Sequence, residues 1–207
     1  MKNAVKISMM TATIAVAMMF FGGCKKETGT PSLESGKFNG KVNATNVDGA
    51  PSTIVGVAPW NLLDLNSQNG QFGDEVSFSN KRFTVDLPKT LPKNAKMYDI
   101  EKFFEEVFNV TGSLKYSDPK VKVASALFFA GTATHWVGHF YHATDDDKVI
   151  CFFVYADEDV TVTGGSNISV KLEEGWNRVY FTDSGNKKDN KYSTKPVEGL
   201  KWFYEAF

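Results

Sequence analysis

From residue 36 onward, the dominant pattern of the chain is an alternation of apolar and polar residues with a period of two. Phe38, Gly40 and Val42 alternate with polar neighbours, and residues 82–87 (RFTVDL) repeat the pattern. Successive side chains of a strand lie on opposite faces, so these segments are expected to be half-buried strands. Residues 149–155 (VICFFVY) are apolar at every position, which indicates a central strand buried on both faces.

Further extended segments follow one another at short intervals. They are expected at residues 52–58, 111–116, 121–129, 135–142, 160–163, 167–172, 178–181 and 200–204. Pro59 ends the first of them, and residues 60–65 are expected to form a short helical turn or a packed loop. Residues 173–177 (EEGWN) are expected to be a turn. Short strands at regular spacing predict an all-β fold, an antiparallel β-sandwich built as one unit or as two packed β subdomains.

One segment, residues 99–109, has helical periodicity instead. Its apolar stripe, spaced i, i+3, i+4, i+7 and i+8, is Ile100, Phe103, Phe104, Val107 and Phe108. Asp99 is expected to cap the helix by accepting hydrogen bonds from the first N–H groups. The helix divides the chain into an N-terminal β region (36–92), a helical connector (93–110) and a C-terminal β-sandwich region (111–207).

The N-terminus carries a different pattern. Lys2 and Lys6 precede an uncharged run over residues 7–21, which ends at Gly22-Gly23-Cys24 before a charged segment. This is the pattern of a signal peptide, residues 1–23, and a cysteine directly after the cleavage point indicates acylation of Cys24. The run is too short to span a bilayer, which takes about 20 apolar residues. Phe21 stands where lipoprotein signals usually carry an aliphatic residue, so ordinary cleavage without acylation is the alternative.

Residues 24–35 are polar, with Gly, Pro and Ser, and are expected to form a lipid-anchored tether. Without Lys2 and Lys6, acidic residues exceed basic ones by about three, which argues against nucleic acid as a partner. Cys151 is then the one cysteine left beside Cys24, so the core must hold without a disulfide if Cys24 is acylated. Aromatic residues make up 14% of the chain, including 17 Phe, which suffices for such a core.

Several segments resemble those of uncharacterised small β-rich lipoproteins of Bacteroidales-type bacteria. They are FTVDLP (83–88), YADEDVTVTG (155–164), LEEGWN (172–177) and KWF (201–203), together with the lipoprotein-type start. The resemblance implies a β-rich envelope protein at the bacterial outer membrane, with exposure at the cell surface left open. It implies no catalytic residues.

The histidines gather in one stretch, as His135, His139 and His142. Imidazoles are common metal ligands, but in a strand His135 and His139 lie about 13 Å apart at roughly 3.3 Å per residue. His142 points to the opposite face. We therefore expect no metal site here.

Other candidate chemistry is also weak. The acidic runs 145–147 and 157–159 lack the spacing of a calcium loop and are expected to be charged turns. No pair of carboxylates is singled out for glycoside hydrolysis, and Cys151 lies in an apolar run where a thiol is inert. We expect neither a cofactor nor enzymatic activity.

The tryptophans are the remaining candidates for a binding site. Trp60 and Trp176 lie nearest to expected turns, so they are the ones most suited to exposure and ligand contact. The sequence favours a non-enzymatic envelope module that binds or assembles with a protein partner. A carbohydrate-binding protein that uses exposed aromatic rings is the alternative, and a polysaccharide-processing enzyme is less favoured. The identity of the partner and the oligomeric state stay open.

Overall fold

The computed structural model describes residues 34–207 except residues 63, 66–69, 111–112, 165–166 and 187–188. The expected signal peptide and Cys24 lie outside the described residues. The residues that are described belong to one compact unit.

This part of the chain forms 14 strands and one helix. The strands are β1 (Lys41–Ala44), β2 (Gly56–Asn61), β3 (Val76–Ser77), β4 (Phe83–Asp86), β5 (Tyr98–Asp99), β6 (Lys115–Tyr116), β7 (Lys122–Gly131), β8 (Trp136–Ala143), β9 (Val149–Ala156), β10 (Val160–Gly164), β11 (Ile168–Leu172), β12 (Gly175–Thr182), β13 (Lys191–Ser193) and β14 (Lys201–Ala206). The helix is α1 (Ile100–Glu106). The expected all-β fold with one short helix is confirmed.

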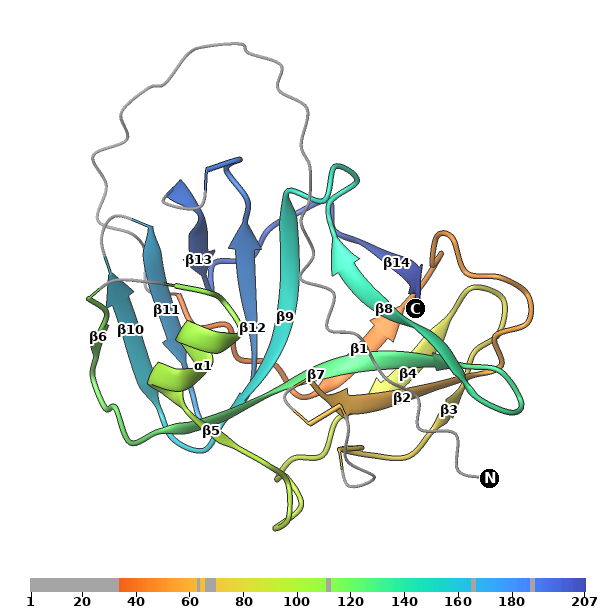
Figure 1. Cartoon of the computed structure of the whole chain (residues 1–207), viewed down its shortest axis with the longest axis horizontal. Coiled ribbons are helices and arrows are strands. Elements are labelled where there is room, and N and C mark those ends of the chain that lie inside the picture. The colour runs from red at the N-terminus through yellow and green to blue at the C-terminus, as the bar shows by residue number, and fades with distance from the viewer. Residues whose placement is uncertain (1–33, 63, 66–69, 111–112, 165–166, 187–188) are drawn as a thin grey trace, which may run out of the picture. The chain divides into compact units, whose positions relative to one another are not determined.

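The strands form a 12-stranded sheet and a two-stranded sheet, β1–β4. The large sheet runs β3-β2-β7-β8-β9-β12-β13-β11-β10-β6, with β14 beside β8 and β5 beside β7. It branches at β7, whose first half pairs with β9 and whose second half pairs with β8. Figure 1 shows β7 crossing between the two groups of strands. The N-terminal β region therefore contributes to both sheets, since β2 and β3 join the large sheet and β1 and β4 form the small one.

The first buried cluster lies between the large sheet and β1–β4, which makes the sandwich. Val42 and Val85 face inward from the small sheet, and Phe128, Phe140 and Phe153 face them from the large one. Aromatic rings contact one another across this core: Phe83 lies 5.1 Å from Phe140 between ring centroids. Burial of such rings supplies most of the driving force for folding.

The second cluster lies on the opposite face of the large sheet, under α1. Phe103 and Phe104 of the helix are buried against Val123 of β7 and Val154 of β9. Strand β9 contributes to both clusters, since Cys151, Phe153 and Tyr155 face the first and Val154 and Ala156 the second. The expectation that residues 149–155 form a central strand is confirmed.

The helix differs from the expected one at both ends. Asp99 makes no side-chain cap; its carboxylate instead contacts the ammonium group of Lys122. The helix ends at Glu106, because Asn109 adopts a positive φ of 49° and the N–H of Val110 donates to the carbonyl of Phe104. A left-handed residue of this kind closes a helix.

Residues 60–65 were expected to leave the sheet after Pro59, and this is wrong for the first two of them. Strand β2 continues through Pro59, Trp60 and Asn61, paired with β7. The carbonyl of Pro59 accepts from the N–H of Phe72, so its ring nitrogen also faces that side. The proline therefore removes no hydrogen bond from the ladder with β7.

The expected turn over residues 173–177 is shorter than predicted, because β12 already begins at Gly175. Gly175 has a φ of 100°, which lets the chain reverse there. The buried Asn177 closes the turn: its Oδ1 accepts from the N–H of Glu173, and its Nδ2 donates to the carbonyls of Glu173 and Gly175. Trp176 and Asn177 are thus strand residues.

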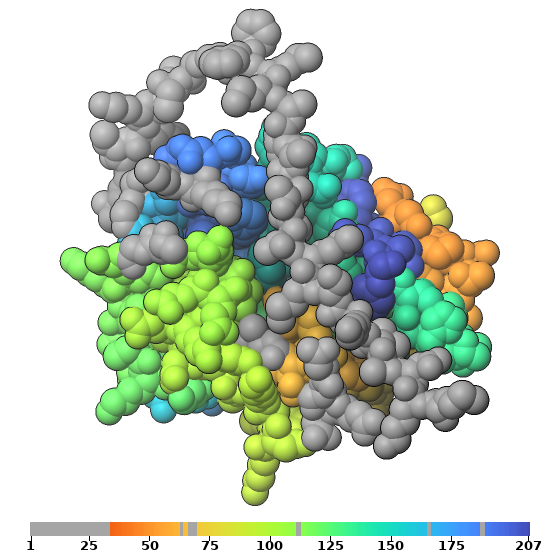
Figure 2. Space-filling model, in the orientation of Figure 1, coloured from red at the N-terminus to blue at the C-terminus, as the bar shows by residue number. Residues whose placement is uncertain are grey.

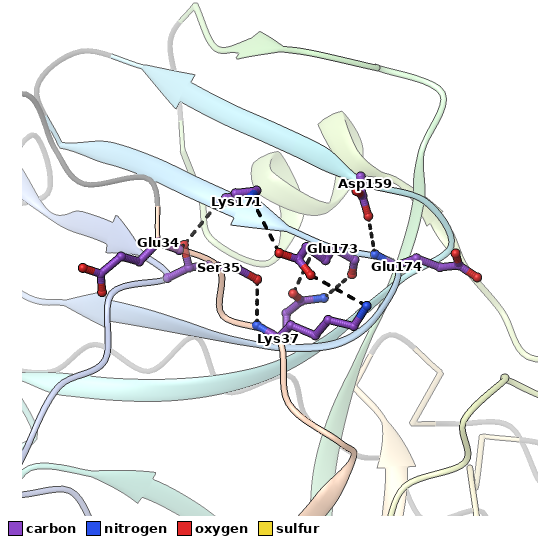
Figure 3. Close-up of polar contacts among 9 residues, drawn as sticks. Glu34, Ser35, Lys37, Asp159, Lys171, Glu173 and Glu174 are labelled. Carbon is purple, nitrogen blue, oxygen red and sulfur yellow. Dashed lines mark hydrogen bonds and ion pairs between the residues drawn. The ribbon is translucent and has the colours of Figure 1, made fainter.

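The first described residues are fixed to this same turn. The N–H of Phe38 donates to the carbonyl of Trp176, and the N–H of Arg178 donates to the carbonyl of Gly36. Figure 3 shows Lys37 and Lys171 on either side of Glu173, with Nζ–Oε distances of 3.7 and 3.6 Å. The segment that follows the expected tether therefore lies along β12.

Candidate functional site

The two tryptophans expected to be exposed have different environments. Trp176 is only 3% exposed, and its Nε1 donates to the carbonyl of Pro88 at 2.8 Å. The expected exposure is therefore wrong for Trp176, because β12 carries it into the first buried cluster. Trp60 is half-buried and lies on the other face of the large sheet.

Trp60 belongs to a group of aromatic side chains that lies outside both buried clusters of the described residues. We call this group the aromatic face. It comprises Trp60 of β2, Phe129 of β7, Trp136, His139 and Tyr141 of β8, Phe203 of β14, and Phe207. Neighbouring rings are in contact, with centroids 5.3 Å apart for Trp60–Phe129, 5.4 Å for Phe129–Phe207 and 5.5 Å for Tyr141–Phe203.

Strand register explains why these residues gather. Phe129 lies opposite His139, and His139 lies opposite Glu205. Tyr141 lies opposite Phe203 in the same ladder. Directly opposed residues of an antiparallel pair share a face, so β2, β7, β8 and β14 present their rings on one side. Figure 1 shows β8 next to β14.

Trp136 reaches the aromatic face through an irregularity in the sheet. The register of β7 and β8 shifts so that Gly131 pairs with Trp136 while Ala130 pairs with Gly138. Bulges of this kind redirect a side chain to the other face. The ring of Trp136 lies over Gly131, where an added Cβ would come within 2.7 Å of it. A side chain at position 131 would therefore displace the indole.

The environment of Trp60 fixes its orientation. Its Nε1 donates to the carbonyl of Asp64 at 3.3 Å, and its indole lies over Gly70. The ring also contacts Trp136 at 6.3 Å with an interplanar angle of 68°. The indole N–H is thus hydrogen-bonded within the protein, and the rest of the ring adds apolar surface to the aromatic face.

The charged group on this face is Glu205, whose Oε2 lies 3.5 Å from Nε2 of His139. Burial lowers the pKa of His139, and the nearby carboxylate of Glu205 opposes this shift. Burial likewise raises the pKa of Tyr141, with a smaller contribution from Asp147. Both shifts favour neutral rings at pH 7, so the aromatic face is apolar with one ionisable pair within it.

The remaining candidate residues are dispersed. His139 and His142 lie on opposite faces of β8, since His139 stacks on Phe207 and His142 stacks on Trp202. His135 is exposed in the loop before β8. Among the described residues, no three His, Cys, Asp or Glu side chains are grouped to hold a metal ion. Cys151 is buried, and burial raises its pKa to about 12.

A separate hollow lies on the other side of β8 and β14. It has a volume of about 430 Å³ and is lined by residues from the segment after β1, from β8 and from β14, among them Asn43, Asn46, Asp48, His142 and Trp202. In Figure 2, the orange N-terminal residues and the blue C-terminal residues lie side by side on the surface, as the pairing of Asp48 with Phe203 requires.

Comparison with known proteins adds no assignment to these two surfaces. No family model, no curated protein and no solved structure matches this chain. Among the described residues, no helix has the length and apolar character needed to cross a membrane.

Proposed function

We propose that this chain is a non-enzymatic, lipid-anchored protein of the cell envelope whose aromatic face binds a protein partner. The signal-peptide pattern that ends at Cys24, and the resemblance to small β-rich lipoproteins, support an anchor in the bacterial outer membrane. Exposure at the cell surface stays open in this proposal. The tether up to residue 35 leads directly to the segment fixed along β12, so the domain would be held close to the lipid.

The observation that carries the binding role is the aromatic face itself. Phe207 is 72% exposed and the other rings are half-buried, except Phe129, which is 7% exposed and lies beneath them. Contiguous apolar surface is uncommon on proteins that have no partner. Tyr, Trp and Phe are enriched in protein interfaces and often supply most of the binding energy.

The ring geometry favours a protein over a glycan. A sugar stacks on a flat ring face. Tyr141 and Phe203 are nearly parallel at 25°, but Phe129 and Phe207 meet at 88° and Trp60 and Trp136 meet at 68°. These rings present edges and faces together, which suits the irregular apolar surface of a protein. The glycan alternative is supported by the pair of His139 and Glu205 among the rings, because polar groups beside aromatic rings can bind sugar hydroxyls.

Site-specific photocrosslinking in the native envelope tests the proposal. A photoreactive phenylalanine analogue replaces Phe203 in the full lipoprotein, and the same analogue at Val55 serves as control. Val55 is apolar and 49% exposed but lies outside the aromatic face. We expect a discrete protein adduct from position 203 and none from position 55, with the yield reduced at least fivefold by Tyr141→Ser.

The nature of the adduct decides between the alternatives. A protease-resistant adduct that contains carbohydrate would replace the protein proposal by the glycan alternative. Equal adduct patterns from positions 203 and 55 would reject a role for the aromatic face. Fatty-acid labelling that is lost in Cys24→Ala supports the anchor, and an unmodified Cys24 in a soluble product contradicts it.

A further inference from the structure

The hollow behind β8 and β14 has the volume of a small ligand site. Its volume of about 430 Å³ falls in the range of about 300–1,000 Å³ that is typical of ligand sites. It lies on the opposite face from the aromatic face, because His142 and Trp202 alternate with Tyr141 and Phe203 along their strands. The two surfaces can therefore be changed independently.

One segment supplies most of the polar groups. Asn43, Thr45, Asn46 and Asp48 all line the pocket. Within the described residues, no hydrogen bond uses the side chains of Thr45, Asn46 or Asp48, whereas the Oδ1 of Asn43 accepts from the hydroxyl of Thr84 at 3.0 Å. An amide, a hydroxyl and a carboxylate are thus available at one hollow, and together they can both donate and accept hydrogen bonds.

The backbone holds this segment in place from both sides. The N–H of Val47 donates to the carbonyl of Lys81, next to β4. The N–H of Asp48 donates to the carbonyl of Trp202, and the carbonyl of Asp48 accepts from the N–H of Tyr204. Asn46 adopts a φ of 55° between these anchors. The backbone of this segment is therefore fixed, so that ligand binding would have to order only the exposed side chains of Thr45, Asn46 and Asp48.

The aromatic part of the lining is the half-buried ring of His142, which lies on Trp202 of the first buried cluster, itself only 5% exposed. The rings of His142 and Trp202 are stacked with centroids 4.8 Å apart and an interplanar angle of 14°, and Trp202 stacks in turn on Phe153 at 5.9 Å. The Nδ1 of His142 is buried and forms no hydrogen bond within the described residues. Flat aromatic walls beside polar side chains suit ligands that have an apolar face and a polar rim.

Charge narrows the ligand class. Lys201 lines the pocket, but its Nζ is paired with Oδ2 of Asp145 at 2.7 Å. Burial, and secondarily the charge of Arg178, lowers the pKa of His142 to about 4, so its ring is neutral at pH 7. An anion such as phosphate would meet no unpaired cation among the lining residues. A divalent cation would find a single carboxylate, Asp48, where several are needed.

We infer that this pocket binds a neutral saccharide unit. In this arrangement Asn46 and Asp48 hydrogen-bond to its hydroxyl groups, and the ring of His142, which is backed by the buried Trp202, contacts its C–H face. This activity goes beyond the proposed binding of a protein by the aromatic face, and neither surface needs the other.

Titration of the full mature chain with named sugars tests the inference. The probes are glucose, galactose, mannose and N-acetylglucosamine at millimolar concentrations, with inorganic phosphate and calcium as comparisons, and binding is followed by amide chemical shifts in NMR. We expect saturable binding of at least one sugar, with shifts concentrated at residues 43–48 and 200–202. Asn46→Gly and Asp48→Asn should each weaken it about tenfold.

The variants are chosen to keep the fold. Glycine accepts the positive φ of position 46, and asparagine has the shape of Asp48. Asn94→Ala, at an exposed position away from the pocket, should bind as the unchanged protein does. The inference is overturned if none of the four sugars binds, if both pocket variants bind normally, or if phosphate or calcium binds there instead. Sugar-induced shifts at Tyr141 and Phe203 would also overturn it, and would count against the protein-binding proposal as well.

Discussion

At the scale of single residues, burial decides the role of each tryptophan more than its distance from a turn does. Trp176 follows a glycine turn in the sequence but is enclosed by Phe72 and Tyr155, with centroids 5.8 and 5.5 Å away. A sequence shows that a turn is near, but the side chain's direction depends on where the strand begins, here at Gly175.

Truncation of the two tryptophans should therefore differ in its effect on stability. We expect Trp176→Ala to lower the free energy of unfolding by about 3–5 kcal/mol, through lost burial and the orphaned carbonyl of Pro88. Trp60→Ala should lower it by about half as much, because that ring is half-buried. Urea denaturation of both variants measures this difference, and equal losses would contradict the assigned environments.

His142 should make stability depend on pH. Its folded pKa of about 4 lies below its ordinary value of 6.5, so between these values the unfolded chain binds a proton that the folded chain does not. The free energy of unfolding should therefore fall as pH falls from 6.5 to 4, by about 2 kcal/mol from this group.

The comparison with His142→Gln isolates this contribution. In that variant the loss of stability between pH 7 and pH 4 should be smaller, whereas His135→Gln, in an exposed loop, should behave as the unchanged protein does. Urea denaturation at several pH values checks this. An identical pH profile for His142→Gln would show that the imidazole is not held neutral.

At the scale of elements, the apolar patterns of the sequence predict the longer strands, whereas several of the shortest strands are missed. Residues 82–87, expected from their alternation, contain β4, and residues 149–155, expected from their continuous apolar run, lie in β9, because their apolar side chains face the buried clusters. Strands β3, β5 and β13 have two or three residues each, too few to show a period. Their positions depend on partners far away in the chain, which no local pattern contains.

The turn between β11 and β12 offers a test at this scale. Asn177→Ala removes the side-chain bonds to Glu173 and Gly175 in a buried site, so we expect a loss of about 2 kcal/mol in the free energy of unfolding. Asn39→Ala removes one exposed bond, to the N–H of Lys41, and should change it by less than about 0.5 kcal/mol. Thermal and urea unfolding of both variants gives the comparison, and a neutral Asn177→Ala would contradict the closed turn.

At the scale of the whole molecule, β7 and β9 join the two buried clusters. Phe128 of β7 faces the first cluster and Val123 faces the second. The two clusters should therefore unfold together rather than one after the other.

Variants in each cluster check this cooperativity. Phe128→Ala and Val123→Ala should each lower the melting temperature while tryptophan fluorescence and far-ultraviolet circular dichroism still give coincident transitions. Separate transitions for the two probes in either variant would show that the clusters are independent.

The aromatic face is also a property of the whole molecule, because strands that are distant in the sequence form it. The sequence therefore predicts only a small part of it. The position of Trp60 near a turn predicts its partial exposure. Its location beside Phe129 and Phe207 depends on the pairing of β7, β8 and β14, which the sequence does not show. The segments 135–142 and 200–204 are both rich in aromatic residues, which was the one available signal. Which of their rings face outward depends on a register set by residues about 60 positions apart.

The buried thiol of Cys151 has a practical consequence. A thiol whose pKa is raised to about 12 and that is enclosed in the middle of β9 reacts with an alkylating reagent only when the sheet opens. When the reagent is concentrated enough for alkylation to be faster than reclosing, the rate at which Cys151 is alkylated in native buffer equals the rate at which the sheet opens, and no denaturant is needed.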